Sequence, residues 1–452
     1  MAPHAPAPAH APAPAPRYLH TRAAGVPDPL ATAVRLARSR LADRCAVYEQ
    51  DGRWWFAAGA LGEVTVRQDR VETEWNGERR AAPRTCGHAA QELGAALATA
   101  PVADWRAYGW VAFESAAAAI GRTPADPEQP LAHAFVPAVE AEIGTGGLDV
   151  RCAAPDLLQR VLAAARTPST ETARPARPLD VEAEGPAAYE QAVADAVARI
   201  NRGDLEKVIL SRRVEVPFAL DFPATYAAGR RANTPARSFL LDLPDLRAAG
   251  FSPETVAEVG ADGLVTSQPL AGTRARHTGD PERDARAAAE LRTDVKEIYE
   301  HAVSVQLADT EMRALCAPGS VAVEEFMAVK ERGSVRHLGS RVRGRLRADR
   351  TRWDALAALF PAVTASGIPK PAAYEVIAAH EPARGLYSGA VLRATADGDL
   401  DAALALRTVY THQGRTWLRA GAGIVGVSRP AREYRETCEK LASVAPHLVP
   451  GP

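Results

Sequence analysis

Two short segments of the 452-residue chain each carry a pair of glutamates three residues apart. Glu297 and Glu300 lie in DVKEIYEH, and Glu433 and Glu436 lie in REYRETCEK. Residues i and i+3 of a helix share one face, so each segment presents two carboxylates together. Four carboxylates that meet in the fold suit a hard divalent cation such as Mg²⁺, which prefers oxygen ligands. The spacing alone favours the simpler interpretation, two solvated helix faces with surface salt bridges.

A lysine and a glutamate are candidates for proton transfer. Lys207 begins the alternating segment KVILSRRVEV, which predicts a strand. If this lysine points inward, desolvation lowers its pKa and favours the neutral amine of a general base. A lysine that snorkels from an edge strand fits the pattern equally well. Glu254 follows a proline in GFSPE, and a carboxyl group among apolar neighbours has the raised pKa of a general acid. A carboxylate at the start of a strand or helix is the simpler alternative.

Other polar residues interrupt apolar or glycine-rich segments. PLAGTR, TASGIPK and RAGAG are glycine-containing turns whose backbone N–H groups could face an anion, although most such turns are only turns. Arg407 stands alone in the apolar segment ALALRTVY, and a buried arginine needs a carboxylate partner. His337 in VRHLGS is by itself more typical of a core histidine than of a catalyst, and no histidine spacing indicates zinc.

Lysine is scarce in this chain. Of 54 basic residues only five are lysine, namely Lys207, Lys296, Lys330, Lys370 and Lys440. A GC-rich genome explains the bias. The lysines that remain are nevertheless candidates for tasks that arginine does not perform, such as losing a proton or acting as a compact charge.

The elements that must position these residues follow from pattern and composition. A helix is predicted around Tyr189–Ile200, one long helical stretch over 282–316 and another over 431–443, while SFLLDLPDLRAAGFSPETVAEVG predicts two strands around a loop. The predicted organisation is a disordered Pro/Ala tail over 1–22, an N-terminal part of the fold over 23–166, a linker over 167–186 and a catalytic region over 187–452.

Composition excludes several classes of protein. With 54 basic and 55 acidic residues the net charge is −1, which argues against binding to nucleic acid or to a membrane surface through bulk charge. The five cysteines are scattered and no apolar run reaches the length of a membrane span. The tail lacks the basic start and apolar core of a secretory signal. We therefore expect a reduced, cytoplasmic, monomeric protein.

Taken together, ten segments resemble the chorismate-utilising enzymes, which include anthranilate synthase component I, aminodeoxychorismate synthase, isochorismate synthase and salicylate synthase. In family order they read KVILSR, GFSPE, PLAGTR, KEIYEH, VRHLGS, FPAVTASGIPK, RGLYSG, LRTVY, RAGAGIV and EYRETCEK, and they span roughly residues 185–450. The resemblance implies an α+β fold, a complex arrangement with a large antiparallel β-sheet core flanked by helices. It also implies Mg²⁺-dependent binding of chorismate.

The resemblance also implies roles for individual residues. Glu300 and Glu436 match direct metal ligands, and Glu297 and Glu433 match their partners. The positions that match substrate contacts are Gly272, Thr273, Thr364, Tyr387, Arg407, Gly421 and Lys440.

Within the family, the catalytic positions indicate the nucleophile. Lys207 matches the base, Glu254 the acid and His337 a third catalytic position. Ammonia-using anthranilate synthases typically carry glutamine at the lysine position, and aminodeoxychorismate synthases carry a nucleophilic lysine where this chain has Ala271. Lysine at position 207 together with alanine at position 271 therefore implies water as the nucleophile. One departure is Gln268, where the family pattern leads us to expect glutamate.

The segments FPAVTASGIPK and LYSGAV are most similar to those of salicylate synthases, since isochorismate synthases usually read His-Pro-Thr at FPAVT. The implied reaction converts chorismate through isochorismate to salicylate and pyruvate, for siderophore biosynthesis, without a glutamine amidotransferase subunit. Three alternatives stay open: an isochorismate synthase that releases its product, an ammonia-dependent aminodeoxyisochorismate synthase, and a non-catalytic chorismate-binding protein.

Overall fold

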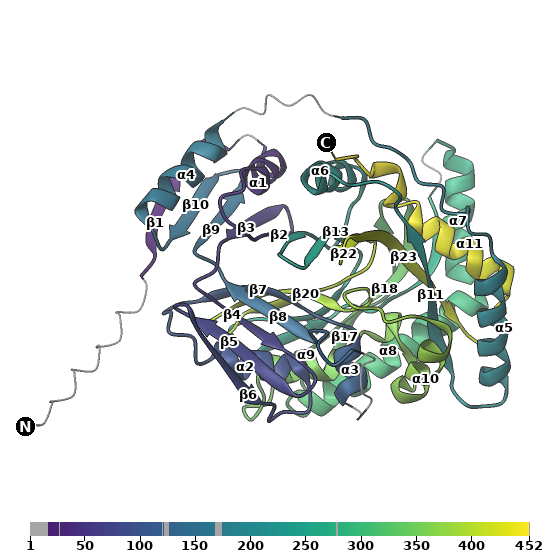
Figure 1. Ribbon diagram of the computed structural model, residues 1–452. Helices are drawn as coiled ribbons and strands as arrows, with labels where there is room; N and C mark the ends of the chain where they lie inside the picture. The colour runs from purple at the N-terminus through teal and green to yellow at the C-terminus, as the bar shows by residue number, and fades with distance from the viewer. Residues whose placement is uncertain are drawn as a thin grey trace, which may run out of the picture.

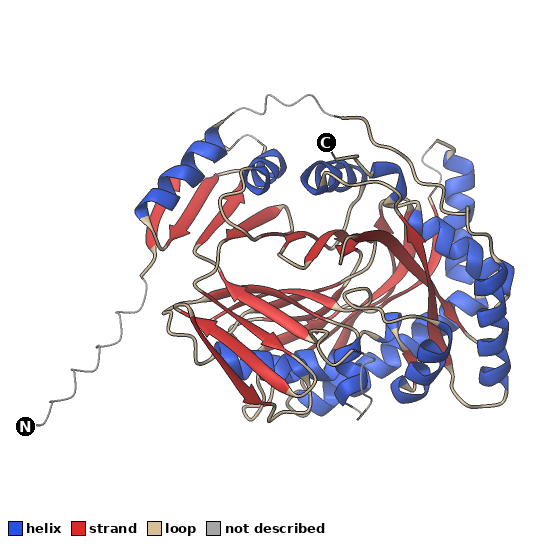
Figure 2. Ribbon diagram, in the orientation of Figure 1, coloured by secondary structure: helices blue, strands red, loops and turns tan. Residues whose placement is uncertain are grey.

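The computed structural model describes residues 17–26, 28–119, 121, 126–167, 174–276 and 279–451. Two large antiparallel sheets face each other, and helices cover their outer faces (Figures 1 and 2). This α+β architecture with large antiparallel sheets confirms the predicted fold class. Most of the expected Pro/Ala tail lies outside the described residues, but its last part does not, because Leu19–Ala23 pairs with β10 as strand β1.

The first sheet has eleven strands. In spatial order they are β1 (Leu19–Ala23), β10 (Gly147–Cys152), β9 (Val139–Gly144), β3 (Arg53–Ala58), β2 (Cys45–Gln50), β12 (Arg237–Asp242), β13 (Leu246–Ser252), β22 (Thr408–His412), β23 (Arg415–Ile424), β11 (Lys207–Glu215) and β19 (Gly367–Ile368).

The second sheet has twelve strands. In spatial order they are β16 (Leu270–Ala275), β18 (Val335–Arg345), β15 (Leu264–Ser267), β14 (Thr255–Val259), β21 (Leu400–Leu404), β20 (Ala390–Thr395), β7 (Arg106–Val111), β8 (Ala132–Val136), β4 (Gly62–Val66), β5 (Arg70–Trp75) and β6 (Glu78–Pro83), with β17 (Ala322–Arg332) paired to β18.

Both sheets combine strands from the two halves of the chain. β2 pairs with β12 in the first sheet, and β7 pairs with β20 in the second. The N-terminal and C-terminal regions therefore complete each other's sheets. They are joined through residues 174–186, which have no helix or strand and touch the C-terminal segment through the Arg177 N–H and the Leu448 carbonyl.

The helices form the outer layers. They are α1 (Pro29–Arg38), α2 (Ala89–Leu97), α3 (Glu114–Ala119), α4 (Pro155–Arg166), α5 (Ala187–Asn201), α6 (Phe222–Ala232), α7 (Pro281–Thr293), α8 (Val295–Leu315), α9 (Arg352–Leu359), α10 (Lys370–His380) and α11 (Pro430–Leu441), with short 3₁₀ turns η1 (Val363–Ala365) and η2 (Ala445–His447). Helices α1, α4 and α6 pack on the first sheet, and α2, α8 and α9 pack on the second.

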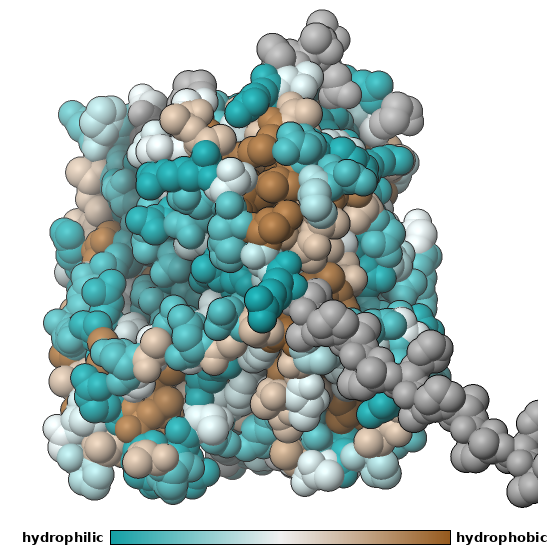
Figure 3. Space-filling view, turned by 90° about the vertical axis from the view of Figure 1, so that its left-hand side faces the viewer, coloured by the Kyte–Doolittle hydropathy of each residue, from teal (hydrophilic) through white to brown (hydrophobic). Residues whose placement is uncertain are grey.

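Apolar side chains gather between these layers. One cluster lies between the sheets and includes Tyr48, Phe135, Phe239 and Tyr387, while two larger clusters join each sheet to its helices. The face at the left of Figure 1 carries mainly hydrophilic side chains with smaller apolar areas among them (Figure 3). No helix of the described residues is long and apolar enough to span a membrane.

Local structure follows the predicted patterns with two corrections. The stretch 282–316 is two helices, because the chain leaves the helical conformation at Asp294, whose carboxylate accepts hydrogen bonds from the N–H groups of Lys296 and Glu297 and so caps a new helix. The segment 238–260 forms three strands, β12 to β14, in place of two, because the chain passes at Pro253 from β13 in the first sheet to β14 in the second.

Candidate active site

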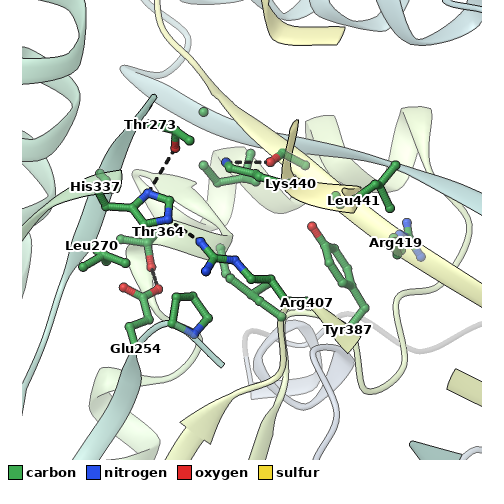
Figure 4. Close-up of a pocket in the computed structure, with 18 of the residues that line it drawn as sticks. Glu254, Leu270, Thr273, His337, Thr364, Tyr387, Arg407, Arg419, Lys440 and Leu441 are labelled. Atoms are coloured by element: carbon green, nitrogen blue, oxygen red, sulfur yellow. Dashed lines mark hydrogen bonds between the residues drawn. The ribbon is translucent and has the colours of Figure 1, made fainter. Parts of the chain in front are cut away.

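A cavity of about 750 Å³ opens between β11, β16, β18, β23 and α11 (Figure 4). It brings together ten of the fourteen residues that the sequence predicts for the site, from segments far apart in the chain. Those ten are Glu254, Gly272, Thr273, Glu300, His337, Thr364, Tyr387, Arg407, Gly421 and Lys440. The other four, Lys207, Glu297, Glu433 and Glu436, do not line the cavity but are buried beside Glu300.

The two glutamate pairs lie at the starts of two helices that meet. Glu297 is in the first turn of α8 and Glu433 in the first turn of α11, where the helix dipole favours negative charge. All four carboxylates are at most 5% exposed. The interpretation of two solvated helix faces is therefore wrong, because the four carboxylates are buried and meet in the fold.

The ammonium group of Lys296 lies among these four carboxylates. Its Nζ is 3.3 Å from Glu300 Oε2, 3.6 Å from an oxygen of Glu297 and of Glu433, and 3.8 Å from Glu436 Oε2. The sequence analysis missed this role, because a lysine four residues before a glutamate usually forms a surface pair. The scarcity of lysine was the one signal that could have found it.

The carboxylates differ in their electrostatics. Burial raises the pKa of Glu433 to about 7 and also raises that of Glu297. Burial also tends to raise the pKa of Glu436, but the positive charges of Lys440 and Lys296 lower it by more. The pKa of Glu436 therefore lies well below its ordinary value. The pKa of Glu300 is lowered in the same way by Lys207 and Lys296.

The residues present fit a divalent cation. The Oε2 atoms of Glu300, Glu433 and Glu436 are buried without a hydrogen-bond partner among the described residues, and an all-carboxylate donor set suits Mg²⁺. Glu297 is better satisfied, since it accepts hydrogen bonds from Thr273 N at 2.9 Å and from Arg274 Nη1 at 2.8 Å. In this arrangement no group of three described His, Cys, Asp or Glu side chains is close enough to hold a metal, because the oxygens surround Lys296.

Lys207 is fully buried at the start of β11. Its Nζ is 3.1 Å from Glu300 Oε1 and 3.0 Å from Ser304 Oγ. Burial lowers the pKa of Lys207, and the charge of Glu300 opposes that shift. The lysine therefore points inward, and the snorkelling interpretation is wrong.

Glu254 lies between β13 and β14 and is 2% exposed. One carboxyl oxygen accepts a hydrogen bond from the Thr364 hydroxyl, and the other, Oε2, has no partner among the described residues. Burial raises the pKa of Glu254 to about 8. The Thr364 hydroxyl, the Leu270 backbone and the charges of Lys207 and Arg407 act in the opposite direction but are outweighed. Near pH 7 this carboxyl group is mainly protonated and can donate a proton.

Arg407 and His337 form a contact at the cavity wall. Arg407 has φ +50°, and its guanidinium contacts His337 Nε2 and donates to the Arg332 carbonyl at 3.1 Å. Arg407 has no ion pair with a carboxylate among the described residues, and burial, with the nearby charge of Arg332, lowers its pKa to about 9. Burial also keeps the pKa of His337 well below its usual range. A neutral His337 therefore donates from Nδ1 to the Gly272 carbonyl at 3.0 Å and accepts from Arg407, which fixes the arginine.

The opposite wall carries Tyr387, Lys440 and the β23 glycines. Lys440 Nζ donates to the Gly421 carbonyl at 2.9 Å and pairs with Glu436 at 2.8 Å. Gly423, which the sequence analysis did not select within RAGAG, allows close approach, because a Cβ there would lie 2.0 Å from Glu300 Oε1.

Arg419 also lines the cavity and was missed by the sequence analysis. It is 3% exposed and pairs with Glu381 at 2.7 Å, while its Nε donates to Ser211 Oγ at 2.9 Å. Arg384 pairs with the same carboxylate at 2.9 Å. Because Arg419 already has a carboxylate partner, Arg407 is the cavity arginine that best suits an external anion.

Comparison with known proteins identifies the family of this chain. A family model for the chorismate binding enzymes matches residues 43–446. A salicylate synthase of Mycolicibacterium paratuberculosis is 43% identical over 93% of this chain and 94% of its own length. An anthranilate synthase component 1 of Streptomyces coelicolor is 41% identical over 63% of this chain and 57% of its own length.

Solved structures agree on the fold. Anthranilate synthase component I of Streptococcus pneumoniae superposes with a TM-score of 0.71 at 29% identity, over 88% of this chain and 92% of that one. MenF, the menaquinone-specific isochorismate synthase of Escherichia coli, shares the fold with a TM-score of 0.71 at 21% identity, over 95% of this chain and 94% of its own. The resemblance seen in the ten segments is confirmed, and this chain belongs to the chorismate binding enzymes.

Proposed function

We propose that this chain is a salicylate synthase that converts chorismate through isochorismate to salicylate and pyruvate, with Mg²⁺ as cofactor. The observation that carries the proposal is the pairing of a buried lysine of lowered pKa with a buried, mainly protonated Glu254 beside one cavity. The 43% identity to a salicylate synthase over nearly the whole of both chains supports the same activity.

Chorismate carries two carboxylates, and the cavity offers cations for them. Arg407 lacks a carboxylate partner among the described residues and is held in place by His337, so a substrate carboxylate compensates its buried charge. Tyr387 and Lys440 lie on the other wall, where a second anionic group fits. Gly272, Thr273 and Gly421 also line the cavity.

Glu300 and Glu436 would hold the metal, with Glu433 and Glu297 beside them. Bound there, Mg²⁺ would supply positive charge for the ring carboxylate of the substrate and for the surrounding glutamates. Lys296 has to leave the centre of the cluster when the metal binds, because two cations do not share one site.

The first step exchanges one hydroxyl for another. Lys207 takes a proton from the water that adds at C2 of the ring, the ring double bonds shift, and the C4 hydroxyl departs with the proton of Glu254 as water. One water is consumed and one is formed, so the product, isochorismate, has the composition of the substrate. The lowered pKa of Lys207 and the raised pKa of Glu254 favour the protonation states that these roles require.

The second step eliminates pyruvate. The hydrogen at C2 moves to the methylene carbon of the enolpyruvyl group while the C3–O bond breaks, and the ring becomes aromatic as salicylate. This transfer needs neither an added base nor an added acid. The cavity contributes by holding the side chain close to C2.

Water, and not an amine, is the proposed nucleophile. Ala271 lines the cavity where a nucleophilic lysine would be needed for the alternative chemistry, and Lys207 replaces the glutamine of ammonia-using relatives. We further propose that the enzyme acts in the cytoplasm as a monomer without a glutamine amidotransferase subunit, and that its product serves siderophore biosynthesis.

The decisive experiment incubates the purified chain with chorismate and Mg²⁺, without ammonia, and separates the products. We expect salicylate and pyruvate in equal amounts, lost with EDTA and restored by excess Mg²⁺. Isochorismate as the only product would reassign the chain to the isochorismate synthases. No turnover until ammonia is added would overturn the choice of water as nucleophile.

A further inference from the structure

A second, smaller cavity adjoins the first behind Glu254. It encloses about 280 Å³ between atoms, with room for about one water molecule. Glu254 and Thr364 line both cavities, so this hydrogen-bonded pair forms the wall between them. Gln268 and, on α8, Ala308 and Glu311 also line it.

One oxygen of the Glu254 carboxyl group lacks a hydrogen-bond partner in the described part of the protein. Its side chain is almost fully buried, and its Oε2 has no hydrogen-bond partner among the described residues. A buried oxygen without a partner is destabilising, and ordered water is the usual partner where a polar space of sufficient size lies beside it. The second cavity is such a space.

The far side of this cavity leads toward solvent through an acid. Glu311 on α8 pairs with Lys370 at 2.5 Å, and their side chains are 18% and 15% exposed. Neither residue has a role in the proposed reaction. Gln268, the departure from the family pattern, also lines this cavity, and its Nε2 donates to Glu258 at 2.7 Å.

We propose that the second cavity is a water site that returns a proton to Glu254 after each turnover, with Glu311 as the link to solvent. This proposal rests on the proposed function, in which the Glu254 O–H bond breaks and its proton leaves with the C4 hydroxyl. The water then gives a proton to the Glu254 carboxylate and receives one from Glu311, which is reprotonated from solvent. The proton taken up by Lys207 returns to solvent, so no net proton is consumed.

The site predicts an effect on one half-reaction only. Formation of isochorismate uses Glu254 as an acid, whereas elimination of pyruvate from isochorismate does not. Closing the second cavity must therefore slow turnover of chorismate and spare turnover of supplied isochorismate. Damage to the main cavity slows both.

The test fills the cavity from α8. Ala308 is 4% exposed and lines only the second cavity, so Ala308→Leu occupies the water site. We expect chorismate turnover to fall at least about tenfold, and at most by the roughly 10²–10⁴-fold that general acid catalysis contributes, while isochorismate turnover changes by less than about twofold. Ala355→Leu on α9 is the matched control, because Ala355 is fully buried but lines neither cavity.

A second variant avoids overpacking. Glu311→Gln keeps the shape of the cavity but removes the proton link, and we expect a slower first step with a larger solvent deuterium isotope effect than in the wild type. Equal losses on both substrates, or unchanged chorismate turnover in both variants, would overturn the proposal. Failure of the proposed function shows separately, in a wild-type enzyme that makes no salicylate from isochorismate.

Discussion

The pH dependence of the first step offers the sharpest test of the acid assigned here. Glu254 has a pKa raised to about 8, because burial disfavours its charged form more than Thr364, Lys207 and Arg407 favour it. The enzyme is active in the first step only when this carboxyl group is protonated. The rate of that step is therefore highest well below pH 8 and falls as the pH rises through that value. The expected profile also requires the pKa of Lys207 to lie below that of Glu254, in the direction that burial shifts it.

The size of the effect follows from the two protonation states. With a pKa of about 8, Glu254 is about 91% protonated at pH 7 and about 9% protonated at pH 9, so kcat/KM for chorismate should fall about tenfold between them. A glutamate at its ordinary value would already be almost fully ionised at pH 7 and would give no fall in this range.

The assay follows chorismate and isochorismate consumption at constant ionic strength and saturating Mg²⁺ between pH 6 and 9.5. The isochorismate profile is the internal control, because that step does not use Glu254. Thr364→Val removes a hydrogen bond that lowers the pKa, so it should move the falling limb to higher pH. A flat or rising chorismate profile between pH 7 and 9, or the same limb with both substrates, would refute the reasoning.

Other substitutions test the remaining groups. Lys207→Met should abolish isochorismate formation but leave part of the elimination from supplied isochorismate, and full salicylate production from chorismate would remove the lysine from its role. Glu436→Gln should raise the Mg²⁺ concentration needed for half-maximal activity at least about tenfold, whereas Glu439→Gln, which removes an ion pair with Arg432, should not. Equal Mg²⁺ titrations of the two variants would exclude Glu436 as a ligand. Lys296→Met should tighten Mg²⁺ binding by calorimetry and lower the melting temperature of the metal-free protein, because four buried carboxylates lose their cation; an unchanged melting temperature would contradict this account.

Much of the local structure could be predicted, while the pairing of distant strands could not. The alternation in KVILSRRVEV predicts β11, and the helical spacing predicts α5 and α11. The pairing of β2 with β12, and of β7 with β20, cannot be predicted from the local sequence. The alternation within a strand indicates only that one of its faces is buried, and it does not indicate which strand lies beside it. The break at Asp294 was missed since helical periodicity continues on both sides of the cap.

The sequence by itself determined which residues could do chemistry and which shared a local face: the two glutamate pairs, Lys207 on its strand, and the ordered segments that identify the family. Only the tertiary structure decided the surroundings of those groups, and with them the protonation state that each group takes when it is buried. It brought the first turns of α8 and α11 together so that Lys296 lies among four carboxylates, and it buried Glu254, which raises the pKa of that carboxyl group to about 8. The physical reason is that charge–charge distance and desolvation come from atoms of distant segments, so neighbours in the sequence cannot encode them alone.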